Sequence, residues 1–375
     1  MKALILAGGF GTRLRPLSCT RPKLVFPIAN RPLLDVTLQK LAESGVEEVA
    51  LAVNFMADIL EQTFGKSKYG MGIHYSKDVP LEETETAASP QKSLGTGGAL
   101  KRAESLLGVK EPFFVLNGDI LTDTNYLKLF EEHKRKDGLA TLALYRVNDP
   151  TRYGIARLAR NSRVIEFVEK PLGQGPSNLA NAGIYVLEPD VFDYIKAGKR
   201  CSIEREVFPK LARERKLFGH EISGLWIDIG KPSDLIKANR LWLEFGSERA
   251  SKCKDATIGK TTKIKEAVAL GEGVVVGEKS EIGPNVSLGK SADVGNRVSI
   301  RDSIIFPNTS ISDHTRIVGA IIGDSVAIGK GVIVEEGCLV GDSSIIQDNV
   351  KLAQNVKICP SKTISHDIPA SVCVM

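Results

Sequence analysis

A six-residue repeat in the last third of the chain restricts the fold more than any other feature. From Ile258 onward an aliphatic or large apolar residue returns at every sixth position, with a slip in register near Ile311. Three such hexapeptides form one triangular coil whose apolar residues stack inward, so we predict a left-handed parallel β-helix over residues 256–375. The predicted inward residues are Ile258, Ile264, Leu270, Val276, Ile282, Leu288, Val294, Ile300 and Phe306, and after the slip Ile328, Val334, Val340, Ile346, Leu352, Ile358 and Ile364.

The first two thirds of the chain show a different sequence pattern. Apolar runs of strand length alternate with helical patterns up to about residue 245, which predicts βαβ units and a mostly parallel, Rossmann-like sheet. We therefore expect an α/β domain over residues 1–250, joined by a linker at 252–255 to the β-helix domain at 256–375. Strands are expected over 3–7, 49–53, 73–76, 113–116 and 140–145, and helices over 33–44, 56–64, 97–107 and 125–136.

Composition and charge limit the partners. The net charge of +5 is not gathered into a long basic block, so nucleic acid is not an expected partner. Residues 1–7 offer no signal-peptide core, and no apolar run approaches membrane-spanning length, so we expect a cytoplasmic chain without a membrane anchor. The six cysteines follow no metal-ligand spacing and are read as reduced thiols.

A glycine-rich loop follows the first strand. Gly8, Gly9 and Gly11 let the backbone turn and present N–H groups to an anion, while Arg13 and Lys23 add fixed positive charge. The loop lacks the Gly-Lys-Ser/Thr ending of a Walker loop and the third glycine of a dinucleotide fingerprint. A chain of phosphates is the expected ligand.

Two carboxylates come directly after apolar runs and beside glycines. Asp119 ends the run over 113–118, and Asp228 lies in the run over 225–230. An isolated aspartate at such a place is most often a turn or capping residue. Two aspartates facing one crevice can instead bind Mg²⁺, which takes one or two carboxylates and completes its shell with phosphate and water.

These motifs together resemble those of the sugar-1-phosphate nucleotidylyltransferase family. The run over 8–16 followed by Pro22-Lys23 matches the family signature G-G-x-G-T-R-L-x-P…P-K, and further motifs at 117–119, 153–154, 167–171, 181–185 and 226–230 follow in the family's order. Weaker motifs at 94–99, 150–154 and 202–209 resemble the branch that transfers guanylate to mannose-1-phosphate. The resemblance covers essentially the whole chain.

The resemblance implies transfer of a nucleoside monophosphate from a nucleoside triphosphate, GTP first, to a sugar-1-phosphate, mannose-1-phosphate first, with Mg²⁺ as cofactor. Asp119 and Asp228 would hold the metal, Arg13 would contact the nucleotide phosphates, and Lys23 would bridge the reacting phosphates. The implied nucleotide site comprises Leu6, Ala7, Gly8, Gly9, Gly11, Thr12, Arg13, Gly95, Thr96 and Asp119, and the implied sugar-phosphate site comprises Gly154, Glu169, Lys170, Asn181 and Asp228.

Several alternatives stay open. The polar segment 79–93 is longer than the family pattern and borders the implied base site, so UTP or dTTP with glucose-1-phosphate is a second substrate pair. Hexapeptide proteins include acyltransferases with a loop histidine, for which His314 and His366 are the candidates, although we read both as surface turns. A third alternative is a non-catalytic subunit that senses nucleotide sugars. We also expect a homo-oligomer that assembles through the β-helix.

Overall fold

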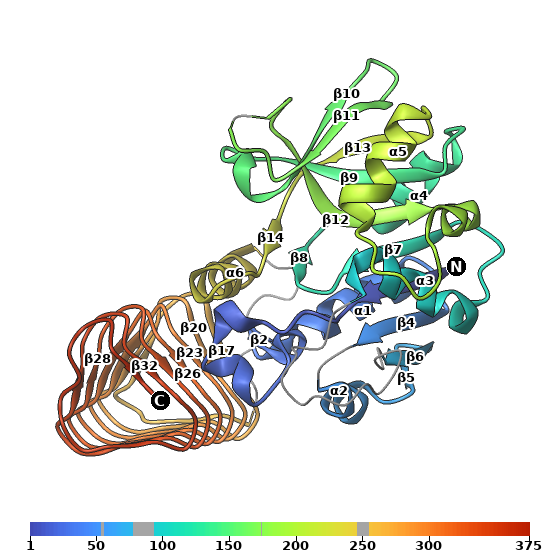
Figure 1. The fold of residues 1–375 in the computed structure, drawn as a ribbon. Helices are drawn as coiled ribbons and strands as arrows, with labels where there is room; N and C mark the ends of the chain where they lie inside the picture. Colours follow the sequence, from blue (N-terminus) through green and yellow to red (C-terminus); the bar gives the residue numbers. More distant parts are fainter. Residues whose placement is uncertain (54–55, 78–93, 174, 246–254) are drawn as a thin grey trace, which may run out of the picture. The chain divides into compact units, whose positions relative to one another are not determined.

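A computed structural model describes residues 1–53, 56–77, 94–173, 175–245 and 255–375 (Figure 1). The chain divides into two compact units, and each unit combines two separate stretches of sequence. The first unit comprises residues 1–10 and 34–226, and the second comprises residues 11–33 and 227–375. The linker expected at 252–255 falls mainly on residues 246–254, which lie outside the described residues.

The first unit is built on one twisted sheet with a parallel centre. Its central strands are β7 (Phe113–Asn117), β1 (Lys2–Leu6), β4 (Glu48–Val53) and β6 (Met71–Lys77), which pair in parallel in that order. This confirms the predicted Rossmann-like sheet. Antiparallel strands extend it beyond β7, so the strict alternation of strand and helix ends near residue 140. The added strands are β9 (Ala140–Arg146), β10 (Gly154–Leu158), β11 (Val164–Glu169) and β12 (Leu179–Leu187), with β13 (Leu217–Ile222) parallel to β9 and β5 (Ser67–Lys68) against β6.

Helices connect the strands much as the apolar periodicity predicts. Asn125, for example, caps the helix that follows it, because its side chain accepts a hydrogen bond from Lys128 N at 2.9 Å. The core beneath the helices is dense and apolar, with Phe113, Tyr185 and Phe208 fully buried. The helices of this unit are α1 (Leu33–Glu43, beginning at the last residue of the 11–33 stretch), α2 (Ala57–Phe64), α3 (Gly95–Leu107), α4 (Tyr126–Lys134) and α5 (Phe208–Arg213).

The second unit contains three parallel sheets, as the predicted left-handed β-helix requires (Figure 1). The first sheet consists of β15 (Thr257–Ile258), β18 (Val275–Val276), β21 (Asp293–Val294), β24 (Ser310–Ile311), β27 (Ala327–Ile328), β30 (Ile345–Ile346) and β33 (Thr363–Ile364). The second sheet consists of β16 (Lys263–Ile264), β19 (Glu281–Ile282), β22 (Ser299–Arg301), β25 (Arg316–Val318), β28 (Ile333–Val334) and β31 (Lys351–Leu352). The third sheet consists of β17 (Val268–Leu270), β20 (Val286–Leu288), β23 (Ile304–Ile305), β26 (Ile321–Ile322), β29 (Leu339–Val340), β32 (Lys357–Ile358) and β34 (Cys373–Val374).

The slip in the repeat marks a place where coils lose one residue. Asp293 pairs with Ser310 and Ile304 pairs with Ile321, which is a spacing of 17 residues, whereas Ile321 pairs with Leu339 at 18. The strands of each sheet still pair in register, because the residue that these coils lack is missing from a turn between strands. One predicted inward residue is wrong for this reason: Ile305 fills the core position, and Phe306 belongs to a different environment.

The outer face of the third sheet is covered. Outward residues Ser287, Ile304, Ile321 and Leu339 are at most 1% exposed. The cover consists of helix α6 (Pro232–Phe245) and the N-terminal stretch 11–33, which includes β2 (Pro27–Ile28) and β3 (Arg31–Pro32) (Figure 1). Buried Asn239 of α6 ties them together, because its Oδ1 accepts hydrogen bonds from Ala29 N at 2.9 Å and from the Ser287 hydroxyl at 2.8 Å.

Among the described helices, none is both long enough and apolar enough to cross a membrane.

Candidate active site

The glycine-rich loop starts where β1 ends, at the edge of the sheet where the central strands end. Leu6 pairs with Asn117 of β7, and Gly118 N donates a hydrogen bond to Leu6 O at 3.0 Å. The carboxyl ends of these two parallel strands therefore bring Asp119 to the start of the loop, as the strand order predicts. Ala7 is buried, whereas Gly9 is exposed, so the loop rises from the core to the surface over a few residues.

The rest of the loop belongs to the second unit and continues into a short 3₁₀ turn, η1 (Thr12–Leu14). Leu14 N donates to Gly11 O at 2.8 Å, and the Ser18 hydroxyl donates to the same oxygen at 2.7 Å. Leu14 is buried while Thr12 and Arg13 are exposed. Leu14 thus anchors the turn in the core, while Thr12 and Arg13 of the implied nucleotide site remain accessible.

Arg13 lies against the motif that contains Asp228. Asp228 ends β14 (Trp226–Asp228), and Gly230 N then donates to Asp228 O at 3.1 Å in a tight turn. A Cβ placed on Gly230 would lie only 3.1 Å from Arg13 Nη2, so the guanidinium lies directly against this glycine. Two motifs separated by more than 200 residues in sequence therefore meet within the second unit.

Lys23 is the third predicted group in the second unit. It begins the 3₁₀ turn η3 (Lys23–Val25), which is closed by a hydrogen bond from Phe26 N to Lys23 O at 3.1 Å. The residue is half-buried, and its Cβ lies 3.8 Å from the point where a Cβ on Gly11 would stand. Lys23 consequently returns to the glycine loop, as expected of a residue that acts on the same phosphates.

Three carboxylates of the first unit gather around one phenol. Burial first, and then the nearby carboxylates of Glu204, Glu169 and Asp119, hold the pKa of the Tyr185 phenol well above its usual value. Glu204 and Tyr185 were not among the predicted site residues. Glu204 could have been found, because it lies in the motif over 202–209 that supports the family branch. Tyr185 ends the family motif over 181–185, although an aromatic residue on a central strand is usually part of the core.

The predicted sugar-phosphate residues of this unit also come together. Gly154 pairs with Glu169 across β10 and β11, and Lys170 N donates to Tyr153 O at 3.0 Å. Lys170 Nζ lies 3.8 Å from Glu169 Oε1 and is 58% exposed, so it can turn toward an anion. Burial, followed by repulsion from Glu204, raises the pKa of the Glu169 carboxyl. The pair offers an acceptor for hydroxyl groups beside a mobile cation.

Asn181 is more constrained than the sequence suggests. Its Nδ2 donates to the Tyr185 hydroxyl at 2.9 Å, and its Oδ1 accepts from Gly183 N at 3.0 Å. The residue is 9% exposed. Each amide atom keeps one further hydrogen-bonding position, so a contact with a sugar would add to a network that already fixes the side chain.

The start of α3 packs against another segment of the first unit. The N–H groups of Gly97 and Gly98 donate to Cys201 O at 3.0 and 3.4 Å. A Cβ on Gly97 would lie 2.8 Å from Cys201 Sγ, so the glycine makes room for this segment. The Thr96 hydroxyl donates to Glu204 Oε2 at 2.6 Å and accepts from Ile203 N. Thr96 therefore connects to the carboxylates around Tyr185 through Glu204.

Known families match both parts of this chain. Residues 2–244 match the family described as Nucleotidyl transferase. The chain belongs to this family. Residues 264–374 match a second family, described as GMPPB C-terminal domain, over most of the β-helix.

Similar curated proteins carry one name. The chain is 40% identical over 253 residues to a mannose-1-phosphate guanyltransferase of Yarrowia lipolytica, a match that covers 66% of each chain. It is 40% identical over 257 residues to the protein of the same name from Emericella nidulans, covering 67% of each. The matches therefore span about two thirds of the length of these relatives.

Among solved structures, a Bacillus anthracis protein named as a glucose-1-phosphate thymidylyltransferase, crystallised with sucrose, superimposes with a TM-score of 0.54. It is 27% identical, and the match covers 64% of this chain and 94% of that one. The name of this neighbour differs from that of the curated relatives in both base and sugar.

Asp119 and Asp228 carry carboxylate oxygens, the type of donor that a hard divalent cation such as Mg²⁺ prefers. Among the described residues, no group of three or more His, Cys, Asp or Glu side chains is placed to hold a metal ion. Asp119 in the first unit and Asp228 in the second are single carboxylates at strand ends. Mg²⁺ commonly binds through one or two carboxylates, with phosphate oxygens and water completing its shell.

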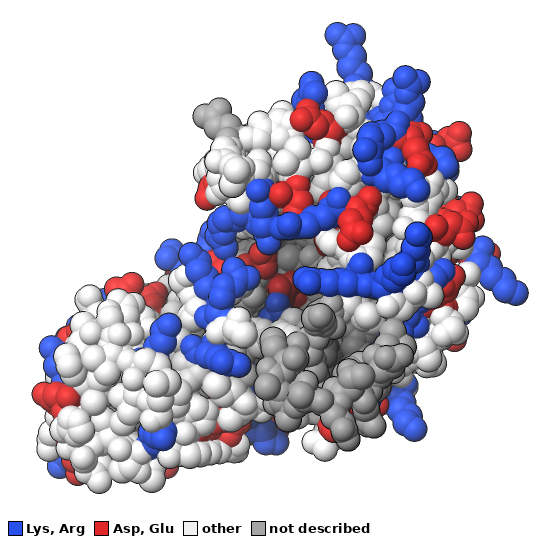
Figure 2. Space-filling view, viewed as in Figure 1, with Lys and Arg blue, Asp and Glu red and all other residues white. Residues whose placement is uncertain are grey.

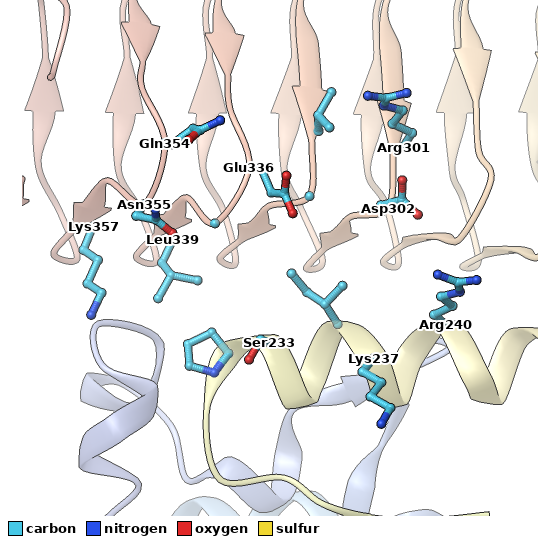
Figure 3. Close-up of a pocket in the computed structure, with 15 residues that line it drawn as sticks. Ser233, Lys237, Arg240, Arg301, Asp302, Glu336, Leu339, Gln354, Asn355 and Lys357 are labelled. Atoms are coloured by element: carbon cyan, nitrogen blue, oxygen red, sulfur yellow. The ribbon is translucent and has the colours of Figure 1, made fainter. Parts of the chain in front are cut away.

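A groove of about 800 Å³ lies in the second unit between α6 and the β-helix (Figure 3). The residues that line it include none of the predicted site residues. In Figure 3 Arg240 points from α6 toward the β-helix, whereas Lys237 points away from the β-helix and Arg301 points away from α6. The basic side chains of this groove therefore do not converge on one point. The segment 79–93, which was expected to border the base, lies outside the described residues.

Proposed function

We propose that this chain transfers a nucleoside monophosphate from a nucleoside triphosphate to a sugar-1-phosphate and releases pyrophosphate. The observation that carries the proposal is the approach of Arg13 to the turn after Asp228. The two motifs are more than 200 residues apart in sequence, and the fold of the second unit brings them together. The placement is useful for a substrate that carries several phosphates and a metal.

The reaction is a direct displacement. An oxygen of the sugar phosphate forms a bond to the α-phosphorus, the bond from that phosphorus to the oxygen bridging to the β-phosphate breaks, and pyrophosphate leaves with the electron pair. Two anions must meet, so Arg13 and Lys23 offset their repulsion and stabilise the charge that moves toward the leaving group. An attraction between unit charges at 4 Å is worth about 1 kcal/mol in water and about 4 kcal/mol at an effective dielectric near 20, so partial exclusion of water strengthens these contacts.

Asp119 and Asp228 are the proposed metal ligands. A bound Mg²⁺ would supply further neutralisation of the phosphate charge. Glu169 and Asn181 would receive the sugar hydroxyls and Lys170 its phosphate. No side chain is assigned as a nucleophile, because positioning and charge stabilisation suffice for this class of reaction.

We infer GTP and mannose-1-phosphate as the substrates, since the similar curated proteins are mannose-1-phosphate guanyltransferases. The thymidylyltransferase name of the structural neighbour keeps dTTP or UTP with glucose-1-phosphate as the second candidate. His314 and His366 are both exposed, His314 in a turn of the β-helix where it has a positive φ and its N–H donates to Asn296 O at 2.9 Å. This placement offers no support for a second, acyl-transferring site.

The β-helix is the proposed surface for a homo-oligomer. Val275, Ile333 and Ile345 point outward from its first and second sheets and are 40–48% exposed. Figure 2 shows that most atoms on the visible face of this domain belong to uncharged residues, with acidic and basic side chains scattered among them.

A substrate matrix tests the proposal. Four nucleoside triphosphates are combined with mannose-, glucose- and N-acetylglucosamine-1-phosphate in the presence of Mg²⁺, and pyrophosphate is measured. We expect the highest rate with GTP and mannose-1-phosphate, and loss of that rate by orders of magnitude in Asp119→Asn and Asp228→Asn. Absence of pyrophosphate release in every combination would favour a non-catalytic, nucleotide-sugar-sensing role.

A further inference from the structure

Arg21 lies between the two cations of the proposed phosphate site in sequence, yet its side chain is directed to the β-helix. Its Nη2 is 2.6 Å and its Nε is 3.2 Å from Asp342 Oδ2, and Nη2 is 3.5 Å from Asp324 Oδ2. The guanidinium also lies over the ring of Phe306, 5.3 Å from its centroid. The Arg21 side chain is 20% exposed, so these contacts are shielded from most solvent.

Asp342 is held rigidly by the β-helix itself. Its Oδ1 accepts a hydrogen bond from Asp324 N at 2.8 Å, and the residue is 7% exposed. Its Oδ2 is left to the N-terminal stretch, where it also accepts from the Thr20 hydroxyl at 2.6 Å. Oδ1 of Asp342 is thus bound within the β-helix, and Oδ2 is bound by Thr20 and Arg21.

Phe306 completes this anchor. Its ring meets that of Phe26 edge to face with centroids 5.8 Å apart, and both side chains are fully buried. The residue that breaks the predicted inward pattern therefore packs against the N-terminal stretch. Arg21 and Phe26 bracket the turn that begins at Lys23, so both ends of that turn are attached to the β-helix.

The attachment is transmitted to Lys23 over a short, stiff path. Pro22 follows Arg21 with φ −69°, a value that its ring enforces, and Val25 N donates to Pro22 O at 3.1 Å. Besides the torsions of the Arg21 side chain, which its contacts hold, only ψ of Arg21 and ψ of Pro22 can rotate between the guanidinium and the Lys23 Cα. A change in the Arg21 contacts would therefore alter the direction in which Lys23 leaves the backbone.

We propose that Arg21 is a positioning residue, which uses Asp342 and Phe306 of the β-helix to aim Lys23 at the reacting phosphates. The inference rests on the proposed function, because it assigns a purpose to Lys23. It gives the β-helix a part in the reaction besides assembly. An arginine suits this task, since its planar fork binds a carboxylate through two nitrogens while its face stacks on an aromatic ring, and lysine can do neither.

The test compares steady-state pyrophosphate release by the wild-type full chain and by Arg21→Gln, Arg21→Lys and Asp342→Asn. We expect kcat to fall roughly 30- to 100-fold in Arg21→Gln, because a small misplacement of a positioned group costs about this much. KM for both substrates should change less than about 3-fold. Arg21→Lys should recover part of kcat, and the double variant Arg21→Gln/Asp342→Asn should be no slower than Arg21→Gln.

A matched control is the exposed pair of Lys290 and Glu272 on the same β-helix, whose Nζ to Oε2 distance is 2.8 Å. Lys290→Gln should leave kcat unchanged. Melting temperatures of all variants show that the assays are made on folded protein. A wild-type kcat in Arg21→Gln, or a lower melting temperature with unchanged kcat, would overturn the positioning role. A wild-type chain inactive toward all substrates would instead contradict the proposed function.

Discussion

In the first unit the proposed ligand-facing side chains are mostly acidic or neutral, with Asp119, Glu169 and Glu204 around Tyr185. In the second unit Arg13 and Lys23 supply positive charge beside the Asp228 motif, and they sit on a stretch that packs on the β-helix. Acceptors of hydrogen bonds suit sugar hydroxyls, whereas fixed cations suit phosphate chains. We propose that the first unit binds the sugar phosphate, with Lys170 as the cation assigned to its phosphate, and that the second unit supplies the cations for the phosphates of the nucleotide.

The largest expected effect tests the second unit. Lys23→Ala should lower kcat by about 10²- to 10³-fold, because removal of one preorganised group that stabilises transition-state charge has about this cost. KM for the sugar phosphate should change little. Steady-state pyrophosphate release measures both constants, and Lys290→Ala serves as the control for loss of an exposed lysine. An effect confined to KM would remove the distinction between the units.

One substitution on the covered face of the β-helix and one on an exposed face test whether the two faces differ. Ile321→Asp places a charge on the covered third sheet, where the residue is 0% exposed, and should destabilise the fold by about 3–4 kcal/mol. Ile345→Asp changes an outward residue of the first sheet that is 48% exposed and should cost less than about 1 kcal/mol. Chemical denaturation measures both. Equal losses would show that the first-sheet face is also covered in solution.

We expect acid to lower the stability of the first unit because of His133. Its ring is 1% exposed and contacts Thr141 and Glu188, and burial lowers the pKa of His133 to about 4. Because the unfolded chain binds this proton near pH 6.5, stability falls as pH drops from about 6.5 to about 4. At about pH 5 the loss is about 2 kcal/mol. His133→Gln should melt with a smaller difference between pH 7 and pH 5 than the wild type, and an identical difference would exclude His133 as the cause.

The smallest effect tests sugar recognition in the first unit. Glu169→Gln should raise KM for the sugar phosphate about tenfold, the cost of weakening one charge-assisted hydrogen bond, with a smaller change in kcat. Burial raises the pKa of the Glu169 carboxyl, so as pH falls this carboxylate becomes protonated at a higher pH than an exposed glutamate does. KM of the wild type for the sugar phosphate should therefore rise as pH falls, and this rise should be absent from Glu169→Gln. A profile identical to that of the wild type would contradict the assignment.

Local sequence patterns predict much of the fold because their causes are local. The strands expected at 49–53 and 113–116 are found at Glu48–Val53 and Phe113–Asn117, and the hexapeptide period gives the three parallel sheets. The period cannot show which outer face is covered, since the cover of the third sheet consists of α6 and of residues 11–33, which lie outside the repeat. The error at Phe306 has the same origin: an apolar residue next to a core position can face another segment.

The candidate site was predictable at the level of motifs, and less so at the level of single atoms. The approach of Arg13 to Gly230 and the pairing of Gly154 with Glu169 bring predicted residues together. The hydrogen bonds from Gly97 and Gly98 to Cys201 O could not be foreseen, because a small residue can admit protein as readily as ligand. Glu204 lies in a motif visible in the sequence, but its contacts with Thr96 and Ser202 are created only by the fold.

The stereochemistry at phosphorus tests most directly the claim that these residues only position and neutralise the reactants. The enzyme is supplied with one diastereomer of the α-thio analogue of its preferred nucleotide and with the sugar phosphate, and the configuration of the product is determined by ³¹P NMR. A single in-line displacement predicts inversion at the α-phosphorus. Retention would show two displacements and a covalent nucleotidyl intermediate, and would contradict the mechanism.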